Sequence, residues 1–156
     1  MPEEGQRTRW TGGCQCGAVR YALSTKPRRA SICHCRMCQK AGGAPFMAFA
    51  SVALDDFVTT RGRLSLFRSS DIAERGFCER CGTPLSYRQI ESASISVTIG
   101  SLDHPAEVEP AVQWGVESRL PWFSKLASLP GRTIDSLLEA SHILSVGDRQ
   151  HPDHDT

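Results

Sequence analysis

Seven cysteines in three short groups are the residues of this 156-residue chain best suited to chemistry. The groups are Cys14 and Cys16; Cys33, Cys35 and Cys38; and Cys78 and Cys81. Cysteines that only fill a core would be scattered, and an odd number cannot all be paired in disulfides. Thiolates spaced two or three residues apart are typical of metal sites, above all of zinc sites. The spacing therefore predicts metal binding rather than a disulfide framework.

The grouping further predicts two zinc sites of different kinds. Structural zinc is normally held by four Cys or His ligands, whereas catalytic zinc keeps one coordination position open. The pairs Cys14–Cys16 and Cys78–Cys81 together supply a closed four-thiolate structural site. The remaining triplet, Cys33, Cys35 and Cys38, is then one ligand short, which is what a reactive zinc site requires.

The sequence leaves other interpretations of the triplet open. His34 is a candidate fourth ligand or proton carrier, although adjacent residues on an extended chain face opposite ways. His104 is a second candidate ligand, from a loop, although a lone loop histidine is more often only solvated. A third alternative is a triplet that holds no metal and serves as a redox or packing cluster.

The ligand type restricts the chemistry of the open site. Three thiolates on Zn²⁺ leave the complex negatively charged, so it is a weak Lewis acid compared with a three-histidine site. Binding one more soft ligand is then favoured over generating hydroxide, although water can also fill the position. The triplet therefore indicates a substrate that carries a thiol.

Strands are the main elements predicted to position these cysteines. The clearest is 94–99, where Ile95, Val97 and Ile99 alternate with hydroxyl residues as in a half-buried strand. The other predicted strands are 19–23, 45–52, 63–68 and 112–116. Helices are expected only as a short turn at 35–40 and after Thr133 or Asp135. Residues 148–156 are polar and predicted to be disordered.

The composition excludes several classes of protein. The formal net charge is only +1, which argues against a nucleic-acid-binding surface. No apolar run approaches the roughly 20 residues of a membrane span, and residues 1–9 lack a secretory signal. We therefore expect a cytoplasmic protein with no membrane or nucleic-acid partner; the sequence leaves its oligomeric state unknown.

The cysteines lie in three longer segments: Gly12–Tyr21, Cys33–Lys40 with Gly42 and Gly43, and Arg75–Leu85. These segments resemble the glutathione-dependent formaldehyde-activating enzyme family, which is related to centromere protein V. Weaker matches are Ile99–Asp103 and Pro121–Phe123. The resemblance implies a domain at 11–130, followed by an appendage at 131–156 with a short helix and a disordered tail.

By this resemblance the fold is mainly β and Mss4-like, stapled by zinc, with few short helices. It implies two Zn²⁺ per chain: a structural ion at the four-cysteine site and a catalytic one, at full or partial occupancy, at the triplet. The implied activity is that of a carbon–sulfur lyase that joins glutathione and formaldehyde into S-hydroxymethylglutathione. Two alternatives are a zinc-ribbon-like module that binds protein or nucleic acid, and a redox or metal-buffering protein.

A few further residues are weaker candidates. Arg36 and Lys40 are candidates to attract a substrate carboxylate, but two solvated charges are the more ordinary interpretation. For Gly42 and Gly43 the alternatives are an anion-binding nest and a plain turn. For Trp122 and Phe123 they are the lining of a pocket mouth and a cover for the core. The remaining histidines, His142, His151 and His154, are read as surface or tail residues.

Overall fold

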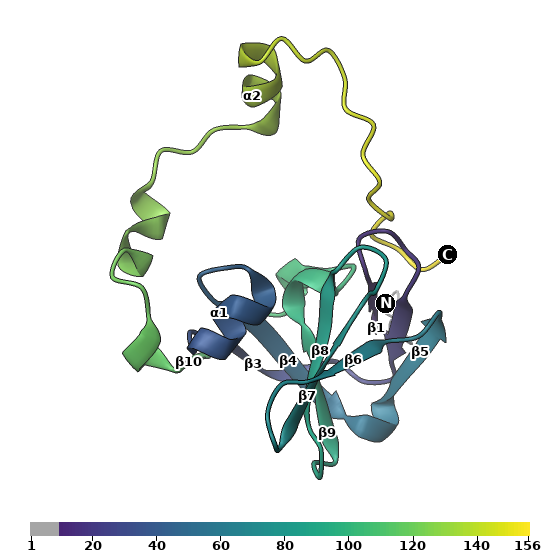
Figure 1. Ribbon diagram of the computed structural model, residues 1–156. Coiled ribbons are helices and arrows are strands. Elements are labelled where there is room, and N and C mark those ends of the chain that lie inside the picture. The colour runs from purple at the N-terminus through teal and green to yellow at the C-terminus, as the bar shows by residue number, and fades with distance from the viewer. Residues whose placement is uncertain (1–9) are drawn as a thin grey trace, which may run out of the picture.

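The computed structural model describes residues 10–156 and forms two sheets (Figure 1). Residues 1–9, read above as lacking a secretory signal, lie outside the described part. The smaller sheet has the order β1 (Trp10–Gly13), β2 (Arg20–Leu23), β5 (Phe57–Arg61). The larger sheet has the order β10 (Val112–Trp114), β3 (Arg28–Cys33), β4 (Met47–Ala53), β9 (Ser94–Thr98), β8 (Pro84–Gln89), β7 (Ala73–Phe77), β6 (Ser65–Arg68). The predicted mainly β fold is confirmed.

Two short α-helices and five 3₁₀ segments complete the described elements. Helix α1 (Arg36–Gly42) follows β3, and its N-cap is Cys35. Helix α2 (Ile134–Ala140) is capped by Thr133, whose hydroxyl accepts a hydrogen bond from the Ser136 amide at 3.1 Å, as the sequence predicted. The 3₁₀ turns are Leu54–Asp56, Ile99–Ser101, Pro105–Glu107, Val116–Ser118 and Phe123–Ser128. Within residues 10–156 we find no helix of the length and apolarity that a membrane span requires.

The larger sheet has an apolar face and a polar face. On β9, Ile95 and Val97 are buried in the main core, whereas Ser94 and Ser96 point to the opposite side. This confirms the strand predicted at 94–99, because successive side chains of a strand alternate between faces. Strand β4 continues the pattern: Ala50 and Val52 lie in the core, and the hydroxyl oxygens of Ser51 and Ser96 are hydrogen-bonded at 2.9 Å on the other face. The triplet lies on the face with the serines, which also carries a small buried cluster of Cys38, Met47 and Phe49.

Several strands were missed by the sequence analysis. Strands β3 and β7 carry Arg28, Arg29, Glu74 and Arg75, so their patterns do not alternate between apolar and polar residues. They form because neighbouring strands in the sheet supply hydrogen-bond partners on both sides. The strand predicted at 63–68 is shorter and spans Ser65–Arg68.

A buried ion pair links the smaller sheet to the loop that follows the Ile99–Ser101 turn. Both guanidinium NH₂ groups of Arg20, on β2, donate to the Asp103 carboxylate at 2.9 and 2.6 Å, and the Thr11 hydroxyl also donates to it. Both charged side chains are only 3% exposed. Burial raises the pKa of Asp103, but the hydrogen bonds from Arg20 and Thr11 outweigh it, so the pKa lies below its usual value.

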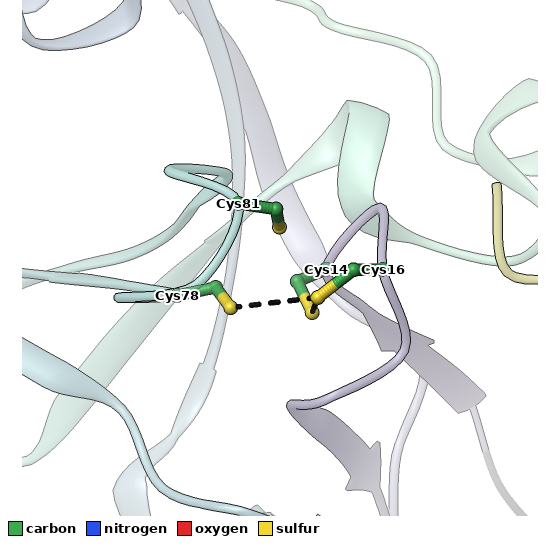
Figure 2. A group of neighbouring side chains, drawn as sticks. All are labelled: Cys14, Cys16, Cys78 and Cys81. Atoms are coloured by element: carbon green, nitrogen blue, oxygen red, sulfur yellow. Dashed lines mark hydrogen bonds between the residues drawn. The ribbon is translucent and has the colours of Figure 1, made fainter. Parts of the chain in front are cut away.

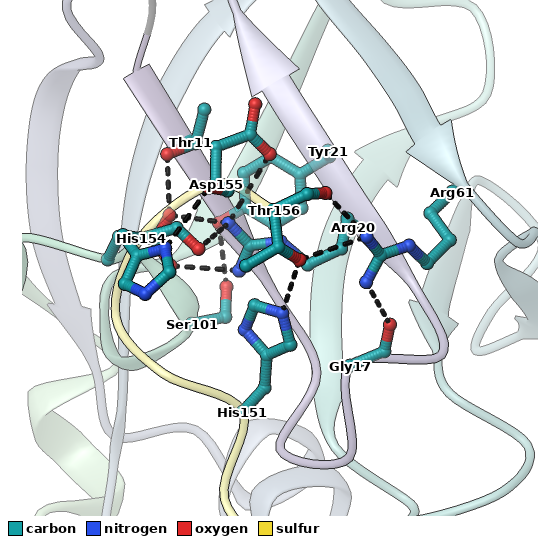
Figure 3. A network of polar contacts seen from close by, with 11 residues as sticks. Thr11, Gly17, Arg20, Tyr21, Arg61, Ser101, His151, His154, Asp155 and Thr156 are labelled. Atoms are coloured by element: carbon teal, nitrogen blue, oxygen red, sulfur yellow. Dashed lines mark hydrogen bonds and ion pairs between the residues drawn. The ribbon is translucent and has the colours of Figure 1, made fainter.

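The C-terminal segment leaves the sheets and returns. Residues 119–147 are mostly exposed and arch away from the body, with α2 near the far point (Figure 1). The tail, predicted to be disordered, comes back to the β1–β2 turn, where the His151 amide donates to the Gln15 carbonyl at 2.7 Å. Figure 3 shows His154 and Asp155 beside Arg20, which donates to the His154 carbonyl at 3.2 Å and lies 3.7 Å from the Asp155 carboxylate.

Candidate metal centres

The first cysteine cluster brings together two turns that are far apart in the sequence. Cys14 and Cys16 lie between β1 and β2, and Cys78 and Cys81 lie between β7 and β8 (Figure 2). All four Sγ atoms lie within 4.8 Å of one another. The Sγ atom of Cys16 is 3.6 Å from that of Cys14 and 3.9 Å from that of Cys78. A tetrahedral zinc site with Zn–S bonds of about 2.3 Å separates its sulfurs by about 3.8 Å, so this donor set fits zinc.

The surroundings of this cluster suit thiolate ligands. The Val19 amide donates to Cys14 Sγ at 3.2 Å, and the Thr83 hydroxyl lies 3.2 Å from Cys81 Sγ. Burial raises the pKa of Cys14 to about 12 in the absence of a cation. Burial also acts on Cys81, but hydrogen bonds with Thr83 and Cys16 outweigh it and lower the pKa of Cys81 to about 6. A bound cation would favour thiolates at every position.

The second cluster is local and consists of the triplet. Cys33 ends β3, Cys35 caps α1, and Cys38 lies in the first turn of that helix. Their Sγ atoms lie within 4.8 Å of one another, and no further His, Cys, Asp or Glu among residues 10–156 joins them. The Cys38 amide donates to Cys35 Sγ at 3.4 Å, so the capping bond of the helix also stabilises a thiolate. The cluster thus offers three ligands for a metal ion.

Arg75 is a residue of this centre to which the sequence analysis assigned no role. It lies on β7, is 8% exposed, and donates from Nη2 to Cys38 Sγ at 3.4 Å. Its guanidinium also lies 5.1 Å from the centroid of the Tyr87 ring. Burial raises the pKa of the Cys38 thiol and Arg75 opposes that rise. Arg75 thus supplies a positive charge beside three sulfurs that would otherwise carry only negative charge.

A cavity of about 510 Å³ opens directly onto the triplet. Its walls contain the three thiols, the rings of Phe49 and Tyr87, and several serines of the polar sheet face. Three guanidinium groups also line it, from Arg29, Arg75 and Arg88, and no carboxylate of the described residues does. This is space in which a polar, negatively charged small molecule could reach the sulfurs.

The four-cysteine cluster has a different setting. The hollow beside it is smaller, about 170 Å³, and is lined by Arg20, Asp103 and His151 together with Cys14. The first two are already paired with each other, and the returning tail covers the turn that carries the cysteines. This cluster is therefore the more enclosed of the two.

The histidine alternatives are not favoured. His34 is fully buried, its Nε2 lies 2.9 Å from Gln113 Oε1, and its ring packs edge-on against Phe123. It belongs neither to the triplet nor to the cavity lining. His104 is exposed.

The weaker candidates lie elsewhere. Arg36, Lys40 and Trp122 line a separate hollow on the other side of α1, and Arg36 is bonded to Gln39. Phe123 covers His34 and Phe46. Gly43 closes the helix in a left-handed conformation, which explains the glycine as a helix cap.

Residues 9–118 match the family model of the glutathione-dependent formaldehyde-activating enzyme. The chain belongs to this family. The match includes all seven cysteines and Arg75, and it ends at the segment that arches away from the sheets. The resemblance read from the cysteine motifs is thereby confirmed, as is the mainly β, Mss4-like fold it implied.

Two further comparisons found similar proteins. An uncharacterised lyase of Schizosaccharomyces pombe is 35% identical over 87 residues, which are 56% of this chain and 58% of that protein. The match therefore spans little more than half of that relative. The crystal structure of a Rhodobacter sphaeroides protein superimposes with a TM-score of 0.52 at 26% identity, covering 67% of this chain and 98% of that one.

Proposed function

We propose that this protein is a zinc-dependent carbon–sulfur lyase acting on the adduct of a small thiol, such as glutathione, with an aldehyde, such as formaldehyde. The observation that carries the proposal is the triplet, a cluster of three thiols with the spacing of metal ligands that faces a cavity able to admit a second molecule. Membership of the family and a relative named as a lyase support the reaction class.

We assign the two clusters different tasks. Cys14, Cys16, Cys78 and Cys81 would hold a structural zinc that ties the β1–β2 turn to the β7–β8 turn. Cys33, Cys35 and Cys38 would hold the catalytic zinc. Zinc bound there favours the thiolate form of an incoming thiol by lowering its pKa.

The balanced reaction is an addition and its reverse. In the synthetic direction the substrate sulfur forms a bond to the aldehyde carbon, the C=O π bond breaks, and the carbonyl oxygen takes up the proton lost by the thiol. In the lyase direction the C–S bond breaks, the hydroxyl proton leaves, and thiol and aldehyde are released. No redox partner is needed in either direction.

The residues around the triplet perform supporting roles in this proposal. Arg75 offsets the negative charge of the thiolates through its contact with Cys38. The rings of Phe49 and Tyr87 provide an apolar wall beside the sulfurs, and Ser51 and Ser96 provide hydroxyl groups for the polar parts of a substrate. Such a wall excludes water from the reacting carbon.

The cavity favours this enzyme over the alternative of a zinc-ribbon-like binding module. A module that only binds protein or nucleic acid has no need of an open metal centre at the floor of a cavity. The test is the equilibration of glutathione and formaldehyde with their adduct, followed by NMR exchange spectroscopy. We expect the zinc-loaded protein to accelerate it and Cys35→Ser to abolish the acceleration. Equal rates with and without the protein would refute the proposal.

A further inference from the structure

The cavity that reaches the triplet carries a positive charge that no feature described so far accounts for. Of its three guanidinium groups, that of Arg75 contacts Cys38 and that of Arg88 lies 3.3 Å from the Glu74 carboxylate. The Arg29 side chain makes no hydrogen bond or ion pair with any residue of 10–156, and it is exposed to the cavity. Arg29 is therefore the cation available to an incoming molecule.

The backbone at Arg29 has a conformation that a regular strand does not have. Strand β3 pairs with β4 through Arg28↔Ser51 and Ser31↔Phe49, so β3 contains one residue more than β4 between these two pairs. This is a β-bulge, and Arg29 within it has a φ of 50°, in the left-handed region. Residues other than Gly, Asn and Asp rarely adopt that conformation, because the Cβ atom crowds the backbone.

Bulges are common beside active sites. Arg29, Ser31 and Cys33 are two residues apart along β3 and all line the same cavity, because alternate residues of a strand face the same side. Four residues of extended strand span about 13 Å, and an arginine side chain can reach back over part of that distance. Arg29 thus lies within reach of a molecule whose sulfur is at the triplet, but beyond the reacting atoms themselves.

We infer that Arg29 is a substrate-binding residue that recognises a carboxylate on the thiol substrate, at some distance from its sulfur. The inference rests on the proposed function and deepens it, since it names the residue that would bind a carboxylate of an acidic thiol such as glutathione. A guanidinium pairs with a carboxylate through two parallel hydrogen bonds, which supplies geometric selection as well as charge. Arginine in the left-handed region costs conformational free energy, and binding of the substrate would explain why that strain is kept.

This assignment replaces Arg36 and Lys40, which the sequence suggested for the same task. Those two residues line a hollow that does not include the triplet. Arg28, next to Arg29, also serves as a contrast: both arginines line a neighbouring hollow, but only Arg29 also lines the cavity at the sulfurs. Comparing a neutral residue at position 28 with one at position 29 therefore distinguishes binding by Arg29 itself from a general effect of positive charge on the affinity.

The test is calorimetric titration of the zinc-loaded full chain with glutathione and with 2-mercaptoethanol, a thiol without a carboxylate. We expect Arg29→Asn to weaken glutathione binding by about tenfold, the loss of a charge-assisted contact, and to change the affinity for 2-mercaptoethanol by less than about twofold. Arg28→Asn should change neither affinity to that extent. Because Asn tolerates the left-handed region, the unfolding midpoint of Arg29→Asn should be equal to or above that of the wild type.

The possible outcomes are distinguishable. If the wild type binds both thiols and Arg29→Asn weakens neither or weakens both alike, the inference is wrong while the proposed function stands. If Arg28→Asn weakens glutathione as much as Arg29→Asn does, the effect is general electrostatics and the inference is also wrong. If neither thiol binds the zinc-loaded wild type, the proposed function itself fails.

Discussion

The two cysteine clusters share their ligand type and differ in almost everything around it. The four-cysteine cluster joins segments that are far apart in the chain, has four sulfurs within 4.8 Å, and lies under the returning tail. The triplet comes from six consecutive residues and opens on a cavity of about 510 Å³. The comparison teaches that ligand count and access, rather than ligand chemistry, separate a site that holds a fold from one that can bind a substrate.

The largest difference should appear when one ligand is removed from each cluster. Zinc binding to a structural site supplies about 10 kcal/mol or more of folding free energy, comparable with the whole stability of a domain. We therefore expect Cys78→Ser to abolish cooperative folding, as measured by thermal unfolding followed by circular dichroism. Cys35→Ser, the matched substitution in the triplet, should fold and lose at least about 100-fold in rate, more than the loss of an outer contact causes.

If Cys35→Ser unfolds as completely as Cys78→Ser, the triplet is a second structural site and the contrast disappears. Should Cys78→Ser instead fold with full activity, the four-cysteine cluster would not be the staple proposed here.

A smaller effect is expected from the buried ion pair that supports the four-cysteine side of the molecule. Replacing Asp103 by Asn removes the buried partner of Arg20 and leaves it only the half-exposed Asp155 carboxylate at 3.7 Å, which should cost about 3 kcal/mol of unfolding free energy near pH 7. Because the pKa of Asp103 is lowered by folding, its ionised form contributes stability above the ordinary aspartate pKa of about 3.9. That contribution declines as the pH falls from there through the lowered pKa.

Urea unfolding of the wild type and of Asp103→Asn between pH 7 and pH 3 measures this contribution. The difference in unfolding free energy between the two proteins should be constant from pH 7 down to about pH 5 and then become smaller. A difference that grows toward low pH would contradict the ion-pair account.

The next largest effect should come from removing the contact between Arg75 and Cys38 of the triplet. Arg75→Gln removes the charge that Nη2 brings to Cys38 Sγ, and loss of such a contact typically costs about 10- to 100-fold in metal affinity. Competition with a zinc chelator measures the affinity of each site separately. Arg88→Gln is the matched control, since Arg88 lines the same cavity and is paired with Glu74 rather than with a thiol. Equal losses in both variants would show that Arg75 acts only through the charge of the cavity.

The smallest effect should come from removing residues 148–156. The tail contributes the amide of His151, the carbonyl of His154 and the carboxylate of Asp155 to contacts with the β1–β2 region. Hydrogen bonds contribute about 1 kcal/mol each on average, and the conformational entropy lost by the ordered tail offsets part of that gain, so the unfolding free energy should fall by about 1–2 kcal/mol. Zinc should also leave the four-cysteine site faster, whereas release from the triplet should not change. An equal change at both sites would argue against a local role for the tail.

The cysteine partition could be predicted from the sequence because its signals are local. Ligands two or three residues apart must meet, and two pairs and a triplet combine in few ways. The strand at 94–99 was equally readable, since its apolar and hydroxyl residues alternate over one buried and one polar face.

The contacts that distinguish the two clusters could not be predicted, because they join residues with no local relation. Arg75 meets Cys38, and Arg20 meets Asp103, only once the sheet order is known. The left-handed conformation of Arg29 follows from the pairing of β3 with β4 and has no signature in the sequence of β3 alone. Arg36 and Lys40 were considered for substrate binding because they follow the triplet in sequence, yet α1 turns them toward another hollow.

A crystal structure of the zinc-loaded protein with glutathione would test the central claim most directly. The account predicts two zinc ions per chain, one surrounded by Cys14, Cys16, Cys78 and Cys81. The other should be held by Cys33, Cys35 and Cys38, with the glutathione sulfur about 2.3 Å away as its fourth ligand. A protein side chain in that fourth position, or glutathione bound with its sulfur away from the triplet, would contradict the account.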